Sequence, residues 1–499
     1  MDIEDPSNLT TRKRLGFLAK DFVLYGGAAA LNRSFALITF PLLARHFSVG
    51  DYGVIDAFTA IASLMTITLV FGQDSAVARF FYEYKDVPTR RQLVTQSLIF
   101  QLVCMLAVLP LLWMAAGSVA GYFHASPQAG PILKLVLMQV PFLLIINFSE
   151  NLLKWTFSRT FFLWLSVGAV LCRMAVLLVA LVRFDIGVQG VFAINLVVST
   201  VFGVLGLFFI RPWLTRPQGF KFLKDMLPFA LPLGVICTIS SFAPVLERAM
   251  VTGLFGKIDL GLYAAGAKLA LLVSLPIQAL QMAWGPFSLA IHKEPNAAAT
   301  YNWVLKGVTL GLCVSVLLLS AGAKPLLTLM ATDRFAGATV VVFPLAMGLA
   351  MQAVGWIPAI GISVAKKTHL NLQCYLAFVV VSAAAIYVFA RAFGLVGIAY
   401  GAMAGHGVKA ILESYFGQKA WPIEWMFGGV VAILSATIAI GICANVVSAL
   451  IDPVSGILIP LLSTPPLVLL GWKLLFTVDE RQKIWGYMIS RLQHKVAAR

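Results

Sequence analysis

The sequence predicts an all-α integral membrane protein with about fourteen transmembrane helices. Of its 499 residues, 60% are hydrophobic and only 12% are charged, and the mean hydropathy is +0.90. Apolar runs of about 20 residues, the length that a helix needs to cross a bilayer, recur from Phe22 to Phe476. The connections between these runs are short, which leaves no room for a soluble catalytic or nucleic-acid-binding domain.

Each apolar run is bounded by short polar or basic stretches, and these set the expected ends of the spans. In chain order, we place the spans at residues 22–44, 51–72, 92–116, 131–153, 160–182, 187–210, 226–254, 261–290, 303–323, 338–363, 370–390, 395–416, 425–447 and 455–476.

Lysine and arginine are concentrated in every second connection. The side of the N-terminus collects about 26 of them, counting Lys306 and Lys409, and the opposite side about 6, so the positive-inside rule places both termini in the cytoplasm. The formal net charge of +16 therefore follows membrane topology, and we expect no nucleic-acid partner.

Three short segments recur at an offset of about 207 residues, each in the same position between spans. The matching pairs are 34–36 with 241–243, 51–53 with 259–261, and 187–191 with 394–398. Because the offset contains an even number of spans, we expect two six-helix lobes related by a pseudo-two-fold axis along the membrane normal, with a cavity between them. The expected division is an N-lobe at 1–210, a cytoplasmic linker at 211–225, a C-lobe at 226–416, and two further helices with a cytoplasmic tail at 417–499.

Ionisable side chains lie deep in several spans. Each costs about 2.5 to 3.5 kcal/mol at the bilayer centre, so we expect them to face a wet interior and not lipid. The cations are Arg33, Arg173, Arg248 and Lys268, and the carboxylates are Asp56, Glu150 and Glu247. Along the fourth span, polar residues at helical spacing form one stripe, which consists of Asn147, Glu150, Asn151 and Lys154.

Structural roles remain open for all of these residues. Glu150 and Lys154 have the spacing of an intrahelical ion pair. The three arginines can equally form ion pairs between helices that only hold the bundle together, and Lys268 can extend toward the membrane surface. Glu247 and Arg248 are direct neighbours, so their side chains point in different directions and need different partners.

Several segments resemble those of the polysaccharide-type flippases of the multidrug/oligosaccharidyl-lipid/polysaccharide exporter superfamily. These segments are Phe-Pro-Leu-Leu-Ala-Arg at 40–45, Gly-Asp-Tyr-Gly at 50–53, Phe-Gly-Gln-Asp at 71–74, residues 79–85, Leu-Pro at 231–232 leading to Glu-Arg at 247–248, Gly-Leu-Tyr at 261–263, 365–368 and 394–399. The similarity covers most of the chain. Many relatives carry an aspartate where this chain has Glu247. The glutamate keeps the negative charge, but its longer side chain changes the geometry.

The resemblance implies that the protein flips an undecaprenyl-pyrophosphate-linked oligosaccharide, such as an O-antigen or exopolysaccharide unit, from the cytoplasmic to the periplasmic leaflet of a bacterial inner membrane. The predicted substrate-binding residues are then Arg33, Arg173, Arg248, Lys268, Asn147, Glu150, Asn151 and Lys154. Candidates for ion coupling are Asp56, Glu150 and Glu247. The expected partners are the lipid-linked oligosaccharide, membrane lipids, and glycan polymerase or ligase machinery.

Two alternatives stay open. A multidrug exporter or a peptidoglycan lipid-precursor flippase of the same superfamily would share the fold. A membrane-embedded glycan polymerase or ligase would need a large loop with catalytic residues, whereas the connections on the side opposite the termini have at most about 15 residues. We find no HExxH, GxSxG, Walker or DxD motif, so we expect no enzyme activity, cofactor or metal.

Overall fold

A computed structural model describes residues 24, 27–28, 31–32, 35, 37–123, 129–451 and 454–482. In these ranges all regular structure is helical, and thirteen helical segments are long and apolar enough to cross a membrane. The prediction of an all-α membrane protein is therefore confirmed. Nine of the 23 residues of the first predicted span, 22–44, lie outside the described residues, the candidate Arg33 among them; residues 37–46 are helical.

The helices follow the predicted spans closely and differ from them mainly at their ends. The first group comprises α2 (Val49–Val70), α3 (Gln73–Glu83), α4 (Val87–Phe123), α5 (Ala129–Trp155), α6 (Arg159–Phe184) and α7 (Val188–Ile210). These are followed by α8 (Lys221–Phe255), α9 (Lys257–Ala270), α10 (Ser274–Ile291), α11 (Ala297–Met330), α12 (Thr339–Trp356), α13 (Ile360–Val364), α14 (Thr368–Phe393), α15 (Leu395–Ala420), α16 (Phe427–Leu450) and α17 (Ser455–Leu474).

The second predicted span is longer than expected, because after a break it continues as α3. The break consists of Phe71 and Gly72, which have φ angles of 49° and 69°. A Cβ on Gly72 would lie 2.4 Å from the carbonyl oxygen of Ala230 in α8, so only glycine fits between the two backbones. The break is thus set by the close approach of α8.

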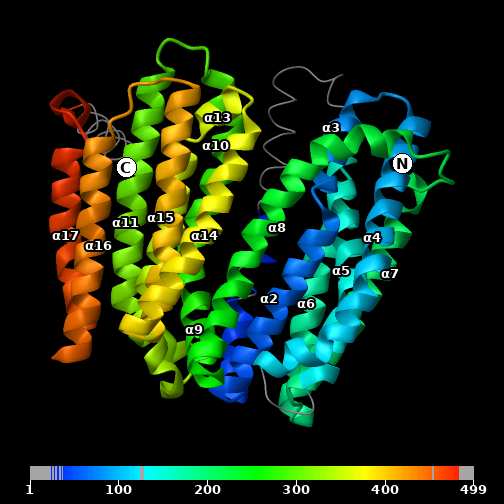
Figure 1. Cartoon of the computed structure of the whole chain (residues 1–499), viewed down its shortest axis with the longest axis horizontal. Helices are drawn as coiled ribbons and strands as arrows, with labels where there is room; N and C mark the ends of the chain where they lie inside the picture. The colour runs from blue at the N-terminus through cyan, green and yellow to red at the C-terminus, as the bar shows by residue number, and fades with distance from the viewer. Residues whose placement is uncertain are drawn as a thin grey trace, which may run out of the picture.

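The helices form two groups that lie side by side (Figure 1). Helices α2 to α7 pack mainly with one another, and α9 to α17 form the second group. Helix α8 runs obliquely between them and contacts α2, α3 and α4 as well as α14 and α15. It contains Pro228, Pro232 and Pro244, each of which removes a backbone hydrogen bond. The exact lobe boundaries stay a prediction.

The two groups meet closely at one face of the molecule, where α2 and α9 begin; we call this the closed face. A Cβ on Gly53 would lie 2.6 Å from the amide nitrogen of Gly261, and one on Gly261 would lie 1.8 Å from the carbonyl oxygen of Val49. Gly53 and Gly261 are equivalent positions of the internal repeat. The two repeats therefore touch through matching residues at this face.

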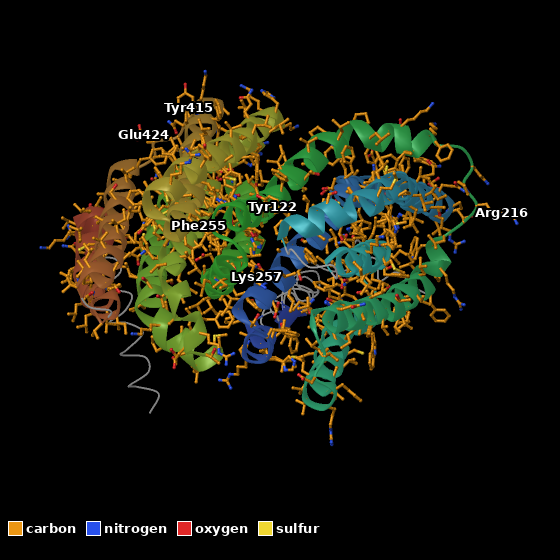
Figure 2. The ribbon with its side chains drawn as sticks, turned by 60° about the horizontal axis from the view of Figure 1, so that its bottom comes forward. Tyr122, Arg216, Phe255, Lys257, Tyr415 and Glu424 are labelled. Atoms are coloured by element: carbon orange, nitrogen blue, oxygen red, sulfur yellow. The ribbon has the colours of Figure 1, made fainter. Side chains whose placement is uncertain are left out.

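A hydrogen bond also joins the two groups at the closed face. The hydroxyl of Tyr122, at the end of α4, donates to the carbonyl oxygen of Ala249 in α8 at 3.0 Å. Figure 2 shows Tyr122, Phe255 and Lys257 where the two groups meet, whereas Arg216 lies at the outer edge in the α7–α8 connection. From the closed face the two groups of ribbons diverge toward the opposite face (Figure 1).

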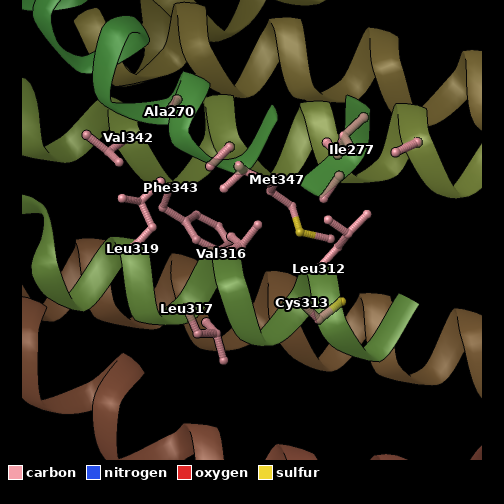
Figure 3. Packing of buried hydrophobic residues seen from close by; sticks show 14 of the residues in the cluster. Ala270, Ile277, Leu312, Cys313, Val316, Leu317, Leu319, Val342, Phe343 and Met347 are labelled. Atoms are coloured by element: carbon pink, nitrogen blue, oxygen red, sulfur yellow. The ribbon is translucent and has the colours of Figure 1, made fainter. Parts of the chain in front are cut away.

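The second group is built around a tightly packed apolar core. Leu312, Val316 and Leu319 of α11 face Val342, Phe343 and Met347 of α12, with Ala270 and Ile277 beside them (Figure 3). The Phe343 ring lies so close to α16 that a Cβ on Gly441 would be 2.0 Å from it. On the outside, apolar side chains such as Met114 and Leu450 are 83% and 80% exposed, as expected for a surface that faces lipid.

Two of the lysines counted on the side of the N-terminus, Lys306 and Lys409, lie inside the predicted spans 303–323 and 395–416 and are buried within helices. Lys306 lies within α11 and is 1% exposed, and Lys409 lies within α15 and is fully buried. Each has a carboxylate partner: Glu480 beyond the end of α17 at 2.9 Å for Lys306, and Glu413 at 2.7 Å for Lys409. Because both lysines are buried beside a carboxylate, they do not count toward the positive-inside rule.

Candidate functional site

A cavity of about 460 Å³ lies where α2, α8 and α9 meet α12, α14 and α15. We call it cavity one. Its polar lining comes from both groups of helices. The lining includes Asp56, Thr59 and Ser63 of α2, Ser240, Glu247 and Arg248 of α8, Lys268 of α9, Gln352 of α12 and His406 of α15.

The wall of cavity one contains a buried cluster of three charges. Arg248 donates from Nε and Nη2 to the same carboxylate oxygen of Asp56, with both distances 2.7 Å. Lys268 Nζ lies 3.1 Å from the other oxygen. The Asp56 side chain is 3% exposed, and those of Arg248 and Lys268 are 10% and 24% exposed. Both ion pairs join α2 to helices of the other repeat.

Glu247 and Arg248 have different partners, as their adjacent positions predict. The hydroxyl of Tyr263 in α9 donates to Glu247 Oε2 at 2.9 Å. Arg248 points to Asp56, and its Nη1 also donates to the backbone oxygen of Pro244 at 2.9 Å. Cavity one is thus lined by two cations and two carboxylates, each carboxylate held by a different set of donors.

A smaller cavity of about 230 Å³, cavity two, adjoins cavity one and shares Asp56, Thr59 and Lys268 with it. Arg173 of α6 lines cavity two. Its Nη2 lies 3.5 Å from Ser199 Oγ, and its buried Nε has no hydrogen-bond partner among the described residues. Three of the four predicted cations therefore line these two adjoining cavities.

The polar stripe of α5 lies apart from both cavities. Its residues interact along the helix: Asn151 donates to Asn147 at 3.2 Å, and Lys154 donates to Asn151 at 3.1 Å. Ser166 of α6 lies close to the Glu150 carboxylate. The described residues show no ion pair between Glu150 and Lys154. None of the four stripe residues lines cavity one or cavity two, so their role in substrate binding stays a prediction.

A buried ion pair in α15 is not among the site residues predicted from the sequence. Lys409 and Glu413 are 2.7 Å apart, and Lys409 Nζ also lies 4.3 Å from the centre of the Tyr375 ring. His406, one turn earlier on the same helix, lines cavity one. The available signal was a lysine and a glutamate four residues apart near the end of the twelfth predicted span. Counting Lys409 with the connections hides this signal, although the predicted span 395–416 contains both residues.

Comparisons with known proteins agree with this architecture. A family model described as polysaccharide biosynthesis protein matches residues 18–292. The chain is 25% identical over 292 residues to Lsg locus putative protein 1 of Haemophilus influenzae, covering 57% of this chain and 70% of that protein. It is 23% identical over 275 residues to an uncharacterized membrane protein of the same organism, covering 54% of this chain and 65% of that one.

Solved structures of transporters share the fold. The inward-facing conformation of a multidrug resistance MATE family transporter of the MOP superfamily superposes with a TM-score of 0.66 at 15% identity, covering 83% of this chain and 96% of that one. The lipid II flippase MurJ, in an inward closed conformation, also gives 0.66 at 15% identity, covering 88% and 97%. Because the family model spans more than half of the residues, this multi-pass membrane protein belongs to the family of polysaccharide biosynthesis proteins.

Proposed function

We propose that the protein is a flippase, not an enzyme, and that it moves a lipid-linked oligosaccharide of a polysaccharide pathway across the inner membrane. The substrate class is an undecaprenyl pyrophosphate that carries an O-antigen, exopolysaccharide or similar repeat unit. Transport runs from the cytoplasmic to the periplasmic leaflet by alternating access. Membership of the polysaccharide biosynthesis family and the transporter fold support this proposal.

The observation that carries the proposal is the lining of the two adjoining cavities, where three cations outnumber two carboxylates. Arg173, Arg248 and Lys268 lie where an anionic headgroup would need donors to replace its hydration shell. Arginine in particular presents a planar fork that matches phosphate oxygens. The hydroxyl and amide groups of the lining, such as Ser63, Ser240 and Gln352, suit the hydroxyls of a sugar. The prenyl tail can remain in the lipid.

The arrangement of the helices supports alternating access. The chain superposes better on the inward-facing conformation of a MATE family transporter than on an outward-facing conformation, with TM-scores of 0.66 and 0.54. Contacts such as that of Gly53 with Gly261 join the two groups at the closed face. In the proposal the closed face is periplasmic, the diverging face is cytoplasmic, and the linker at 211–225 joins the two moving lobes. Asp56, Glu247 and Glu150 are the candidates for ion coupling.

A multidrug exporter or a lipid II flippase is the alternative, since both have this fold. The two cavities together are lined by three cations and two carboxylates, and this excess of positive charge favours an anionic substrate over a cationic drug. It does not separate one anionic lipid-linked glycan from another. That distinction requires a measurement in cells.

The experiment compares the glycan-producing host with and without the gene. Deletion should cause a lipid-linked glycan to accumulate on the cytoplasmic leaflet, and the intact gene should restore export. Arg248→Gln should fail to restore it, whereas the matched variant Arg216→Gln, which alters an exposed arginine in the α7–α8 connection, should succeed. Unchanged export after deletion, or accumulation of a peptidoglycan precursor alone, would contradict the proposed substrate.

A further inference from the structure

Asp56 occupies an unusual position between the two groups of helices. It is the one charged side chain that the first group, α2 to α7, contributes to cavity one among the described residues. Its two partners, Arg248 and Lys268, belong to α8 and α9. The three side chains therefore link the first repeat to the second through ion pairs at the wall of the cavity.

Both oxygens of the Asp56 carboxylate are engaged, one by the Arg248 guanidinium and the other by Lys268. A phosphate group uses the same kinds of donors in the same way, because it also accepts charge-assisted hydrogen bonds from arginine and lysine. Arg248 and Lys268 thus form a preorganised anion site, and a carboxylate of the protein fills it.

We propose that Asp56 occupies this anion site in place of the substrate, and that the substrate's pyrophosphate displaces it and so releases the ion pairs that join α2 to α8 and α9. The inference rests on the proposed function and gives that site a mechanism. The substrate itself would then loosen one of the links between the two groups, and the lobes would rock only when loaded.

A ligand in cavity one can reach the site from which it would displace Asp56. The Lys268 side chain is 24% exposed, so an anion can contact it before the Arg248 pair opens. A pyrophosphate carries more negative charge than a carboxylate and presents more acceptor oxygens, which favours it in the exchange. A ligand can shift a conformational equilibrium only through such a difference in its interactions with the two states.

The released carboxylate needs a new environment, because an unpaired buried charge is costly. Asp56 lines cavity two as well as cavity one, so water in cavity two can solvate it after the exchange. Arg173 also lines cavity two, and its buried Nε has no hydrogen-bond partner among the described residues, so it can supply a counter-charge to the released carboxylate. Cavity two therefore has a defined role in the exchange.

The first test measures binding of inorganic pyrophosphate to the purified full-length protein by calorimetry. Asp56→Asn removes the competing charge, so it should bind pyrophosphate at least about tenfold more tightly than the wild type. The matched control is Asp51→Asn, which removes a carboxylate from the same helix outside both cavities and should bind like the wild type. Equal affinities of all three proteins would overturn the proposal.

Asp56→Asn leaves two buried cations without their counter-charge and will lower stability. A thermal-shift measurement keeps the test decisive: pyrophosphate should raise the melting temperature of Asp56→Asn more than that of the wild type. An equal or smaller rise would overturn the proposal. If deletion of the gene leaves glycan export unchanged but these binding results are obtained, the anion exchange stands and only the glycan assignment falls.

A distance measurement tests the mechanical consequence. Spin labels at positions 184 and 329, whose native side chains are 74% and 69% exposed, report on the closed face from the two groups of helices. Pyrophosphate should increase the population with a longer distance in the wild type, and Asp56→Asn should show that population without ligand. A distance distribution that neither pyrophosphate nor Asp56→Asn changes would overturn the proposed release.

Discussion

Replacing Gly261 by alanine should force the closed face of the protein apart. The added methyl group would lie 1.8 Å from the carbonyl oxygen of Val49, whereas ordinary contact begins at 3.4 Å, so α2 and α9 would have to separate by about 1.6 Å. The clash involves backbone atoms on α2, and no side-chain rotation can relieve it. The separation therefore has to come from movement of one group of helices against the other.

The expected energy follows from the cost of overpacking, which is about 1 to 3 kcal/mol. If all of it acts on the closed state, the ratio of open to closed molecules rises by about 5-fold to 150-fold. Alanine also favours a helix over glycine by about 1 kcal/mol, so the steric effect is partly offset in the overall stability. A change in the conformational ratio is thus a clearer signal than a change in melting temperature.

The assay is the distance between spin labels at positions 184 and 329 in a cysteine-free background, measured without ligand. The matched control is Gly311→Ala in α11, where an added Cβ meets nothing within 4 Å, so the distance should stay unchanged. Gly261→Ala should shift the distribution to longer distances. If both variants give the wild-type distribution, the closed face does not hold the lobes together as argued.

Three further predictions concern other charged residues. Lys409→Met should destabilise the protein by about 3 to 5 kcal/mol, because it leaves Glu413 buried without a partner, and the double variant Lys409→Met with Glu413→Met should recover most of this loss in a thermal unfolding assay. Burial raises the pKa of Glu480, but hydrogen bonds from Lys306 and Thr477 outweigh this and hold the pKa below its usual 4.5. The Lys306–Glu480 contact should therefore stabilise the fold above pH 4.5, and this stabilisation should disappear as the pH falls through the lower folded-state pKa. Hydrogen exchange in residues 477–482, corrected for its intrinsic pH dependence, should then accelerate in the wild type. In Glu480→Gln it should be independent of pH. A reporter enzyme fused after Arg499 should be active as a cytoplasmic protein, and periplasmic activity would reverse the predicted orientation.

The helices could be predicted because a bilayer-length apolar run leaves the backbone few alternatives. The break at Phe71 and Gly72 could not, because it depends on the approach of α8, which follows more than 150 residues later in the chain. The predicted span 395–416 already contains Lys409 and Glu413, but their burial follows from the packing of α12 and α14 against α15. Local patterns give each helix its length, but packing between helices decides where a helix breaks and which charges are buried.

The same distinction applies to the candidate site. The sequence identified Asp56, Arg248 and Lys268 as ionisable residues inside spans, since their presence there is costly in any arrangement. It could not decide which carboxylate pairs with Arg248, because Asp56 and Arg248 are 192 residues apart and Glu247 is an equally charged neighbour. The pairing depends on the packing of α2 against α8, and that is a property of the folded molecule.

The central claim is that an anionic lipid-linked glycan crosses through the cationic cavities. The most direct test reconstitutes the protein in liposomes with a fluorescent undecaprenyl-pyrophosphate oligosaccharide and follows its transfer between leaflets by protection from a quencher. The wild type should transfer the lipid, and the charge-neutral double variant Arg248→Gln with Asp56→Asn should remain folded without transferring it. No transfer by the wild type, or equal transfer by the double variant, would contradict the account.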